Sequence, residues 1–211
     1  FSGPYAATAT TESTWLYAAP ATLENHYDQA RIELKGYDPI FVDAGIYYSA
    51  FNDNATSLRT QSSITYKNAS QWETGRTLNI AYSTKTGAVL LDPATGQFIE
   101  IISGLQKHPL DIIQEQGAGC TADTVATIAD VANLWQAEIQ RIYARLRREF
   151  PQNSAAFDHA EAQWHKHCQA DHAARYITFN KQGSIHSISS AYSYIELYRN
   201  HALRLAQWGR N

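Results

Sequence analysis

Strand-like segments, either alternating between apolar and polar residues or short and apolar, dominate the first half of the chain. They lie at residues 43–51, 62–66, 77–82, 88–91 and 98–102. Turn residues separate the last three segments, because Lys85-Thr86-Gly87 and Asp92-Pro93-Ala94-Thr95-Gly96 each place a glycine late in the turn. We therefore predict a three-stranded antiparallel meander over about residues 76–103.

One segment of the first half also fits a helix. Thr22 is a suitable N-cap, and apolar residues follow it at helical spacing: Leu23, Tyr27, Ala30 and Leu34. A helix over about residues 20–34 is therefore one prediction for this segment.

The second half repeats its apolar residues with the period of an α-helix. A first stripe contains Val125, Ile128, Trp135, Ile139, Ile142 and Leu146. Pro151 ends this helix, and Ser154 is placed to cap a second one, whose stripe contains Phe157, Ala160, Trp164, Cys168 and Tyr176. A third helix is predicted over about residues 189–208. Short connections make the first two helices an antiparallel hairpin.

Charge changes together with pattern near residue 117. Residues 1–119 contain 12 acidic and 7 basic side chains, a net charge of −5, whereas residues 120–211 contain 8 and 10, a net charge of +2. We therefore predict an α+β protein with a β-rich domain at residues 1–117 and a three-helix domain at residues 118–211. The total charge of −3 is too balanced for a nucleic-acid-binding protein, and no apolar run reaches the roughly 18–20 residues of a membrane span.

The cysteines and the missing methionine bear on location. The chain contains no Met and begins at Phe1, so we expect a periplasmic or secreted product from which a leader was removed. Cys120 and Cys168 permit one disulfide in an oxidising compartment. In a hairpin that turns near Pro151, Cys168 faces about residue 134, so the bond requires residues 116–119 to fold back along the helices. We predict this disulfide, with two reduced buried thiols as the alternative.

Several segments of the helical half match a family pattern. They are Leu134-Trp135, Ile142-Tyr143-Ala144-Arg145-Leu146, Ala160-Glu161-Ala162-Gln163-Trp164, Gly183-Ser184, and Glu196-Leu197-Tyr198-Arg199 with Leu203. Over about residues 120–205 the chain resembles the LprI-type lysozyme-inhibitor domain. It departs from that family at His172, where the family usually carries a cysteine, and near Tyr192-Ser193, where a cysteine is also expected. The resemblance implies an exported bacterial protein that binds other proteins at the cell envelope.

The densest group of potential metal ligands follows Trp164. His165, Cys168 and His172 lie at i, i+3 and i+7 on one helix face, and imidazole and thiolate both bind zinc or copper. The first and third are about 10 Å apart along a helix axis, so we expect a solvated face with no bound metal and no other cofactor. The sequence contains no Gly-x-Ser-x-Gly elbow, His-Glu-x-x-His motif or phosphate-binding loop, and we predict that the chain is not an enzyme.

Together these features predict an exported binding protein that inhibits a peptidoglycan-cleaving or other envelope-attacking enzyme. Its partner would be a hydrolase or a secreted toxin, with this chain as lysozyme inhibitor or immunity protein. We expect the partner to contact two turns, Lys85-Thr86-Gly87 and Gly183-Ser184, because glycine lets a partner approach the backbone closely. The alternatives are a small secreted hydrolase of unrecognised type and a His/Cys metal-binding module.

Overall fold

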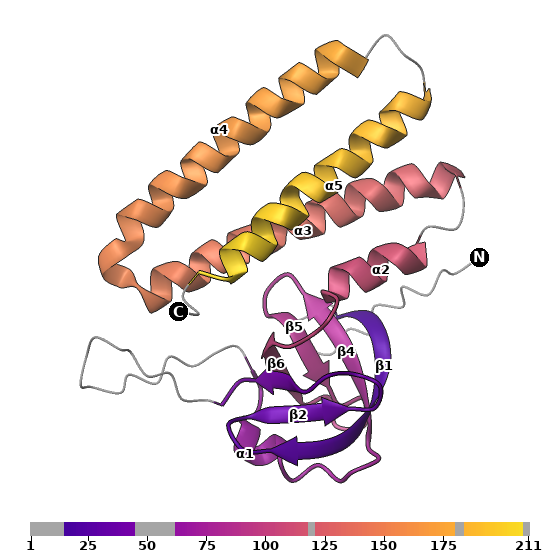
Figure 1. The fold of residues 1–211 in the computed structure, drawn as a ribbon, viewed down its shortest axis with the longest axis vertical. Coiled ribbons are helices and arrows are strands. Elements are labelled where there is room, and N and C mark those ends of the chain that lie inside the picture. The colour runs from indigo at the N-terminus through magenta and orange to yellow at the C-terminus, as the bar shows by residue number, and fades with distance from the viewer. Residues whose placement is uncertain (1–14, 45–61, 118–120, 180–183, 209–211) are drawn as a thin grey trace. The chain divides into compact units, whose positions relative to one another are not determined.

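The computed structural model describes residues 15–44, 62–117, 121–179 and 184–208, and side chains in these ranges except at 117–129, 179 and 184–191. Two compact units make up the chain, residues 1–116 and 117–211. The described strands lie in the first unit and the three longest helices in the second (Figure 1). The predicted α+β class is therefore confirmed.

Six strands of the first unit form a closed barrel in the order β1-β2-β3-β6-β5-β4. Their bounds are β1 Leu16–Tyr27, β2 Arg31–Leu34, β3 Ile40–Val42, β4 Thr77–Ser83, β5 Gly87–Leu91 and β6 Phe98–Ser103. Every neighbouring pair is antiparallel. The 12-residue strand β1 closes the barrel, because its first part pairs with β4 and its last part with β2. The predicted meander over residues 76–103 is β4, β5 and β6, and is confirmed.

Two predictions for the first half are wrong. Residues 20–34 contain no helix: they form most of β1, a turn with positive φ at Gln29 and Ala30, and β2. Pairing with a strand on each side outweighs the helical spacing of the apolar residues. Residues 62–66 do not form a strand but lead into the short helix α1 (Tyr66–Ala69). Of the segment 43–51, residues 43 and 44 lie in no strand, and the rest is outside the described residues.

Aliphatic side chains fill the barrel from successive strands. The register places Ile80, Leu90 and Ile99 side by side on β4, β5 and β6, and all three are fully buried. A second apolar cluster contains Trp15, Ala81, Val89 and Leu91, with Tyr17 and Phe98 packed against it. Because successive residues of a strand point to opposite faces, β5 is buried on both faces. Its run Val89-Leu90-Leu91 therefore shows no alternation.

The second unit contains the predicted three helices. They are α3 (Thr121–Glu149), α4 (Ser154–Phe179) and α5 (Ser184–Ala206), with a single 3₁₀ turn, η1 (Pro151–Asn153), between the first two. Pro151 does end the first helix, and α5 begins five residues earlier than expected.

The short helix α2 (Pro109–Gly117) was not predicted. Gln116 on α2 donates a hydrogen bond from Nε2 to the Ala18 carbonyl on β1, at 2.6 Å.

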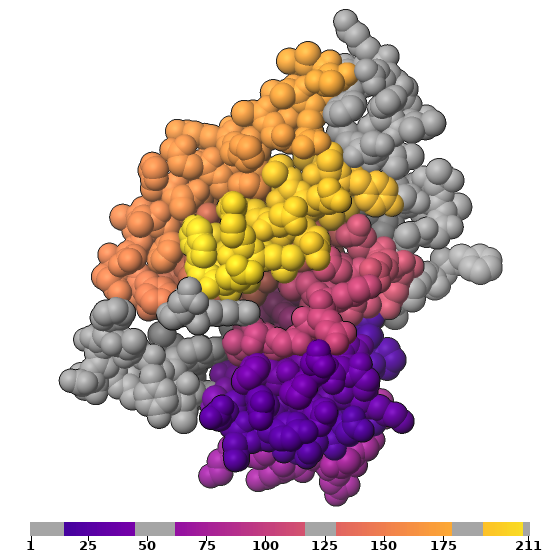
Figure 2. Space-filling view, in the orientation of Figure 1, coloured from indigo at the N-terminus to yellow at the C-terminus, as the bar shows by residue number. Residues whose placement is uncertain are grey.

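Within the second unit, α3 packs mainly against α5, and α4 makes fewer contacts with either. In the space-filling view α4 (orange) and α5 (yellow) both contribute to the surface of this unit (Figure 2). Tyr176, placed by its spacing on the buried stripe of α4, is 66% exposed, so that part of the prediction is wrong. Among the helices that are described, none is long and apolar enough to span a membrane.

Candidate functional site

A cleft of about 500 Å³ lies among the three helices of the second unit. Tyr143 from α3, Trp164 from α4 and His201 from α5 form its buried wall. Three exposed side chains stand at its rim: Gln163, Asn200 and Trp208. The cleft is therefore built from residues that are about 20–60 positions apart in the sequence and that only the packing of the helices brings together.

Ring stacking holds α4 and α5 together at the wall of this cleft. The imidazole of His201 lies parallel to the indole of Trp164, with ring centroids 3.7 Å apart and an interplanar angle of 6°. Tyr198, one turn earlier on α5, meets the same indole edge-on at 6.2 Å. Edge-on aromatic pairs at the second separation stabilise a contact beyond the area that they bury, and the parallel stacking fixes the plane of the His201 ring against Trp164.

Hydrogen bonds determine which nitrogen of His201 carries the proton. Arg204 Nη2 lies 3.1 Å from Nδ1 of His201, and a guanidinium group only donates. Nδ1 is therefore the acceptor and the proton is on Nε2, which lies 3.4 Å from the hydroxyl of Tyr143. That hydroxyl accepts the Nε2–H, and its own hydrogen stays available for donation to another group.

Both titratable groups of the wall are neutral at pH 7. Burial first, and then the positive charge of Arg204 and the neighbouring His167, lower the pKa of His201 to about 4. Burial, with a smaller contribution from Glu161, raises the pKa of Tyr143. None of the described residues that line the cleft is acidic. The cleft thus presents hydrogen-bond donors and the permanent charge of Arg204.

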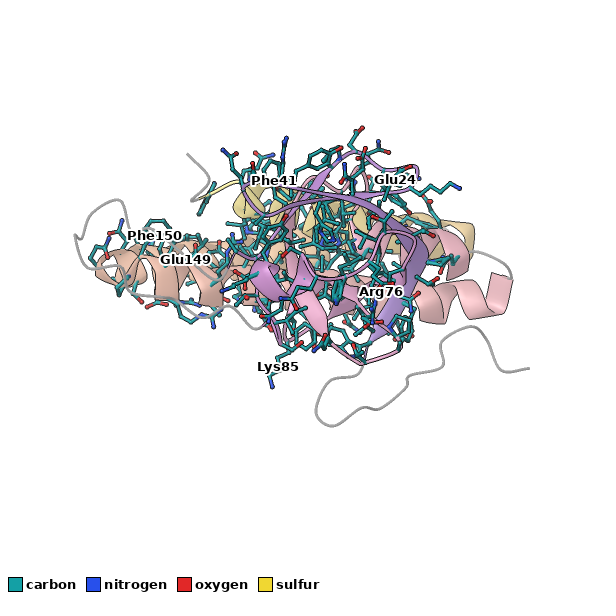
Figure 3. The ribbon with its side chains drawn as sticks, turned by 90° about the horizontal axis from the view of Figure 1, so that it is seen from below. Glu24, Phe41, Arg76, Lys85, Glu149 and Phe150 are labelled. Carbon is teal, nitrogen blue, oxygen red and sulfur yellow. The ribbon has the colours of Figure 1, made fainter. Side chains whose placement is uncertain are left out.

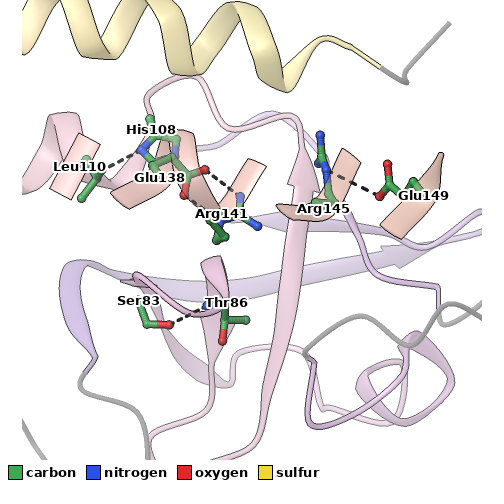
Figure 4. A network of polar contacts seen from close by, with 8 residues as sticks. All are labelled: Ser83, Thr86, His108, Leu110, Glu138, Arg141, Arg145 and Glu149. Atoms are coloured by element: carbon green, nitrogen blue, oxygen red, sulfur yellow. Dashed lines mark hydrogen bonds and ion pairs between the residues drawn. The ribbon is translucent and has the colours of Figure 1, made fainter. Parts of the chain in front are cut away.

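The turn between β4 and β5 holds one group of predicted partner-binding residues. Lys85 is exposed and points away from the barrel (Figure 3). Thr86 and Gly87 are buried, and the Thr86 N–H donates to Ser83 Oγ at 3.0 Å (Figure 4). Of these three residues, only Lys85 has an exposed side chain to offer a partner.

The other predicted turn lies largely beyond the described part of the chain. Gly183 is outside the described residues, and Ser184 begins α5 but its side chain is not among those described. Partner binding at both turns therefore stays a prediction.

The three weak metal candidates occupy successive turns of α4. Nε2 of His165 lies 3.9 Å from Oε1 of Glu161, and the ring of His172 stacks on that of Tyr194 at 4.4 Å. Burial, with a smaller contribution from Asp171, raises the pKa of the Cys168 thiol to about 11. The structure places no group of three His, Cys, Asp or Glu side chains for a metal ion within its described residues.

The predicted disulfide has only one of its cysteines in the described part of the chain. No disulfide is seen at Cys168 among the described residues, and its predicted partner Cys120 lies outside them. The bond between them therefore stays a prediction.

Sequence patterns did not single out His201 or Arg204, although both line the cleft. The available signal was a histidine on the inward stripe of the last helix, among Tyr198, Ala202 and Leu205. Comparisons of the chain with family models, with curated proteins and with solved structures found no match. The likeness to the LprI-type domain therefore stays an inference from the matched residues alone.

Proposed function

We propose that this chain is an exported binding protein that inhibits an enzyme attacking the bacterial envelope, and that the β4–β5 turn enters the active-site cleft of that enzyme. The observation that carries the proposal is Lys85, whose side chain is exposed and projects from the barrel (Figure 3). The buried Thr86 next to it is held by Ser83. A turn held in this way loses little conformational freedom on binding.

The chemistry of glycan-cleaving enzymes fits such a turn. These enzymes place two carboxyl groups at the bond that they cleave. An ammonium group that enters the cleft meets opposite charge there, and its attraction to the carboxylates grows as water is excluded. Lys85 is therefore suited to block a peptidoglycan-cleaving enzyme directly.

The net charge of the first half as a whole supports a basic partner. Residues 1–119 carry a net charge of −5, which would steer a basic hydrolase or toxin towards the barrel unit and raise its association rate. The resemblance to the LprI-type domain supports an envelope location and a protein partner.

The environment of His201 supports binding over catalysis. A general base needs a free lone pair within reach of its substrate, and the accepting nitrogen of His201 is engaged by Arg204. Its other nitrogen donates to Tyr143. We therefore propose that the chain is not an enzyme.

The test is to titrate the purified full chain against a panel of muramidases, amidases and phospholipases. We expect inhibition of at least one panel enzyme, and a loss of about fivefold or more in inhibitory affinity for Lys85→Glu, equivalent to about 1 kcal/mol. Lys67→Glu makes the same change of charge at an exposed residue of α1, and should weaken inhibition by less than about twofold.

Two outcomes would contradict the proposal: no inhibition of any panel enzyme, or equal losses in the two lysine variants. Turnover of a glycan or ester substrate by the chain itself would favour the secreted-hydrolase alternative.

A further inference from the structure

We infer that the cleft of the helical unit binds a sugar acid, a ligand with one pyranose ring and one carboxylate. This inference does not rest on the proposed inhibitory function, because it concerns the other unit and different residues. The cleft volume of about 500 Å³ lies within the range of small-molecule sites in proteins.

Charge in the cleft selects an anion. Arg204 is exposed, and one of its nitrogens contacts Nδ1 of His201. A guanidinium group has five N–H donors in a planar fork, so Arg204 retains donors for a carboxylate, which it is shaped to bind with two parallel hydrogen bonds. No acidic residue is among the described lining residues, and the carboxylate of Glu161, which raises the pKa of Tyr143, is paired with Arg147.

Neutral polar groups of the cleft match the hydroxyl and amide groups of a sugar. The hydrogen of the Tyr143 hydroxyl is available, since that hydroxyl accepts from His201. Gln163 and Asn200 stand at the rim, and each carries an amide that both donates and accepts. A sugar hydroxyl or acetamido group also does both, so it satisfies these side chains better than a simple anion does.

An exposed indole provides a surface for the ring of the sugar. Trp208, just beyond the end of α5, lines the cleft and is 41% exposed. The C–H groups of a pyranose carry a small positive charge, which the negative face of an aromatic ring attracts. Trp164 is less suitable for this contact, because His201 covers one face of its indole.

A phosphate fits this cleft less well than a carboxylate. Arg204 lies in the last turn of α5, where the helix dipole places partial negative charge. That charge opposes a dianion more than a monoanion. Phosphate sites in proteins commonly use the opposite end of a helix.

The experiment measures binding to the full chain by isothermal titration calorimetry. The probes are N-acetylmuramic acid, N-acetylglucosamine, which has the same ring without the carboxylate, and inorganic phosphate. We expect N-acetylmuramic acid to bind at least about tenfold more tightly than either of the other two.

Variants then assign the binding to this cleft. Arg204→Gln should reduce the affinity for N-acetylmuramic acid to that for N-acetylglucosamine, whereas Arg148→Gln, at an exposed arginine near the end of α3, should leave it unchanged. Trp208→Ala should weaken both sugars by about fivefold or more. Circular dichroism checks that each variant is folded. If Arg204→Gln does not fold, Trp208→Ala alone tests whether the sugar binds in this cleft.

Several results would overturn the inference. They are equal affinity for the two sugars, tighter binding of phosphate than of N-acetylmuramic acid, and no sugar binding at about 10 mM ligand. Unchanged affinity in folded Arg204→Gln and Trp208→Ala would place the ligand elsewhere and overturn it as well.

Discussion

Acid should destabilise the helical unit through one histidine. His201 is 7% exposed and stacked on Trp164, and its folded pKa is lowered from 6.5 to about 4. Between these two values the unfolded chain binds a proton that the folded chain does not. The free energy of unfolding therefore falls as the pH drops from about 6.5 to about 4. The stability that is lost in this range is fully present only above the unfolded pKa of His201.

The size of the effect follows from the shift. One pKa unit corresponds to about 1.36 kcal/mol, so the whole shift corresponds to about 3 kcal/mol. Between pH 7 and pH 5 the loss should be about 2 kcal/mol. His201→Phe retains a ring to stack on Trp164 but has no proton to bind. The variant should be less stable at pH 7, since it loses two hydrogen bonds, yet its stability should depend less on pH.

Urea unfolding at pH 7 and pH 5, followed by the helical circular dichroism signal, measures this difference. We expect the pH-dependent loss to be smaller in His201→Phe than in the unmodified chain by about 2 kcal/mol. His159→Phe, at an exposed histidine of α4, is the matched control and should change the loss by less than about 0.5 kcal/mol. Equal pH dependence in His201→Phe and the unmodified chain would refute the reasoning.

Two further predictions concern the barrel unit and are checked by thermal unfolding. Asp92 is fully buried and paired with Arg76 at 2.6 Å. Burial raises the pKa of Asp92, but the hydrogen bonds that it accepts, above all the one from Arg76, hold the pKa below its ordinary value. Arg76→Gln should therefore lower the free energy of unfolding by about 2–3 kcal/mol. Lys107→Gln, which breaks an exposed ion pair, should lower it by less than about 0.5 kcal/mol. Equal losses in the two variants would contradict this reasoning. Gly104→Ala should cost at least about 2 kcal/mol, because φ is +96° and the new Cβ would lie 2.8 Å from a backbone oxygen. Gly36→Ala, with φ of +83° and open space, should cost about 1 kcal/mol, and a larger loss there than at Gly104 would refute the steric argument.

The parts of the fold that were predictable depend on neighbours in the sequence. β4, β5 and β6 follow one another through short turns, so alternation in β4, short apolar runs in β5 and β6, and the turn residues between them were sufficient to predict all three. Closure of the barrel was not predictable, because Leu16 on β1 pairs with Tyr82 on β4, 66 residues further along the chain. Leu23 shows the same limit: its helical spacing is real, but its burial in β1 is decided by these distant partners.

Prediction of the candidate site failed for a related reason. His165 and His172 attracted attention because ligand-type residues are dense around them, yet both are exposed on α4. His201 was not predicted as a site residue, because a single histidine between apolar positions is typical of a buried helix face. Its importance depends on Arg204 on its own helix and on Tyr143 and Trp164 on two others, and a pattern within one helix contains no information about the other two.

The chemistry of His201 connects the stability of the helical unit with the proposed ligand. A phenylalanine at this position would offer Trp164 a ring and would avoid the cost of burying an imidazole. What the imidazole adds is an acceptor for Arg204 and a donor for Tyr143. The first contact holds a cation at the cleft, and the second leaves the Tyr143 hydrogen free for a ligand. The acid sensitivity of the helical unit and its preference for an anionic, acceptor-rich ligand therefore have one structural cause.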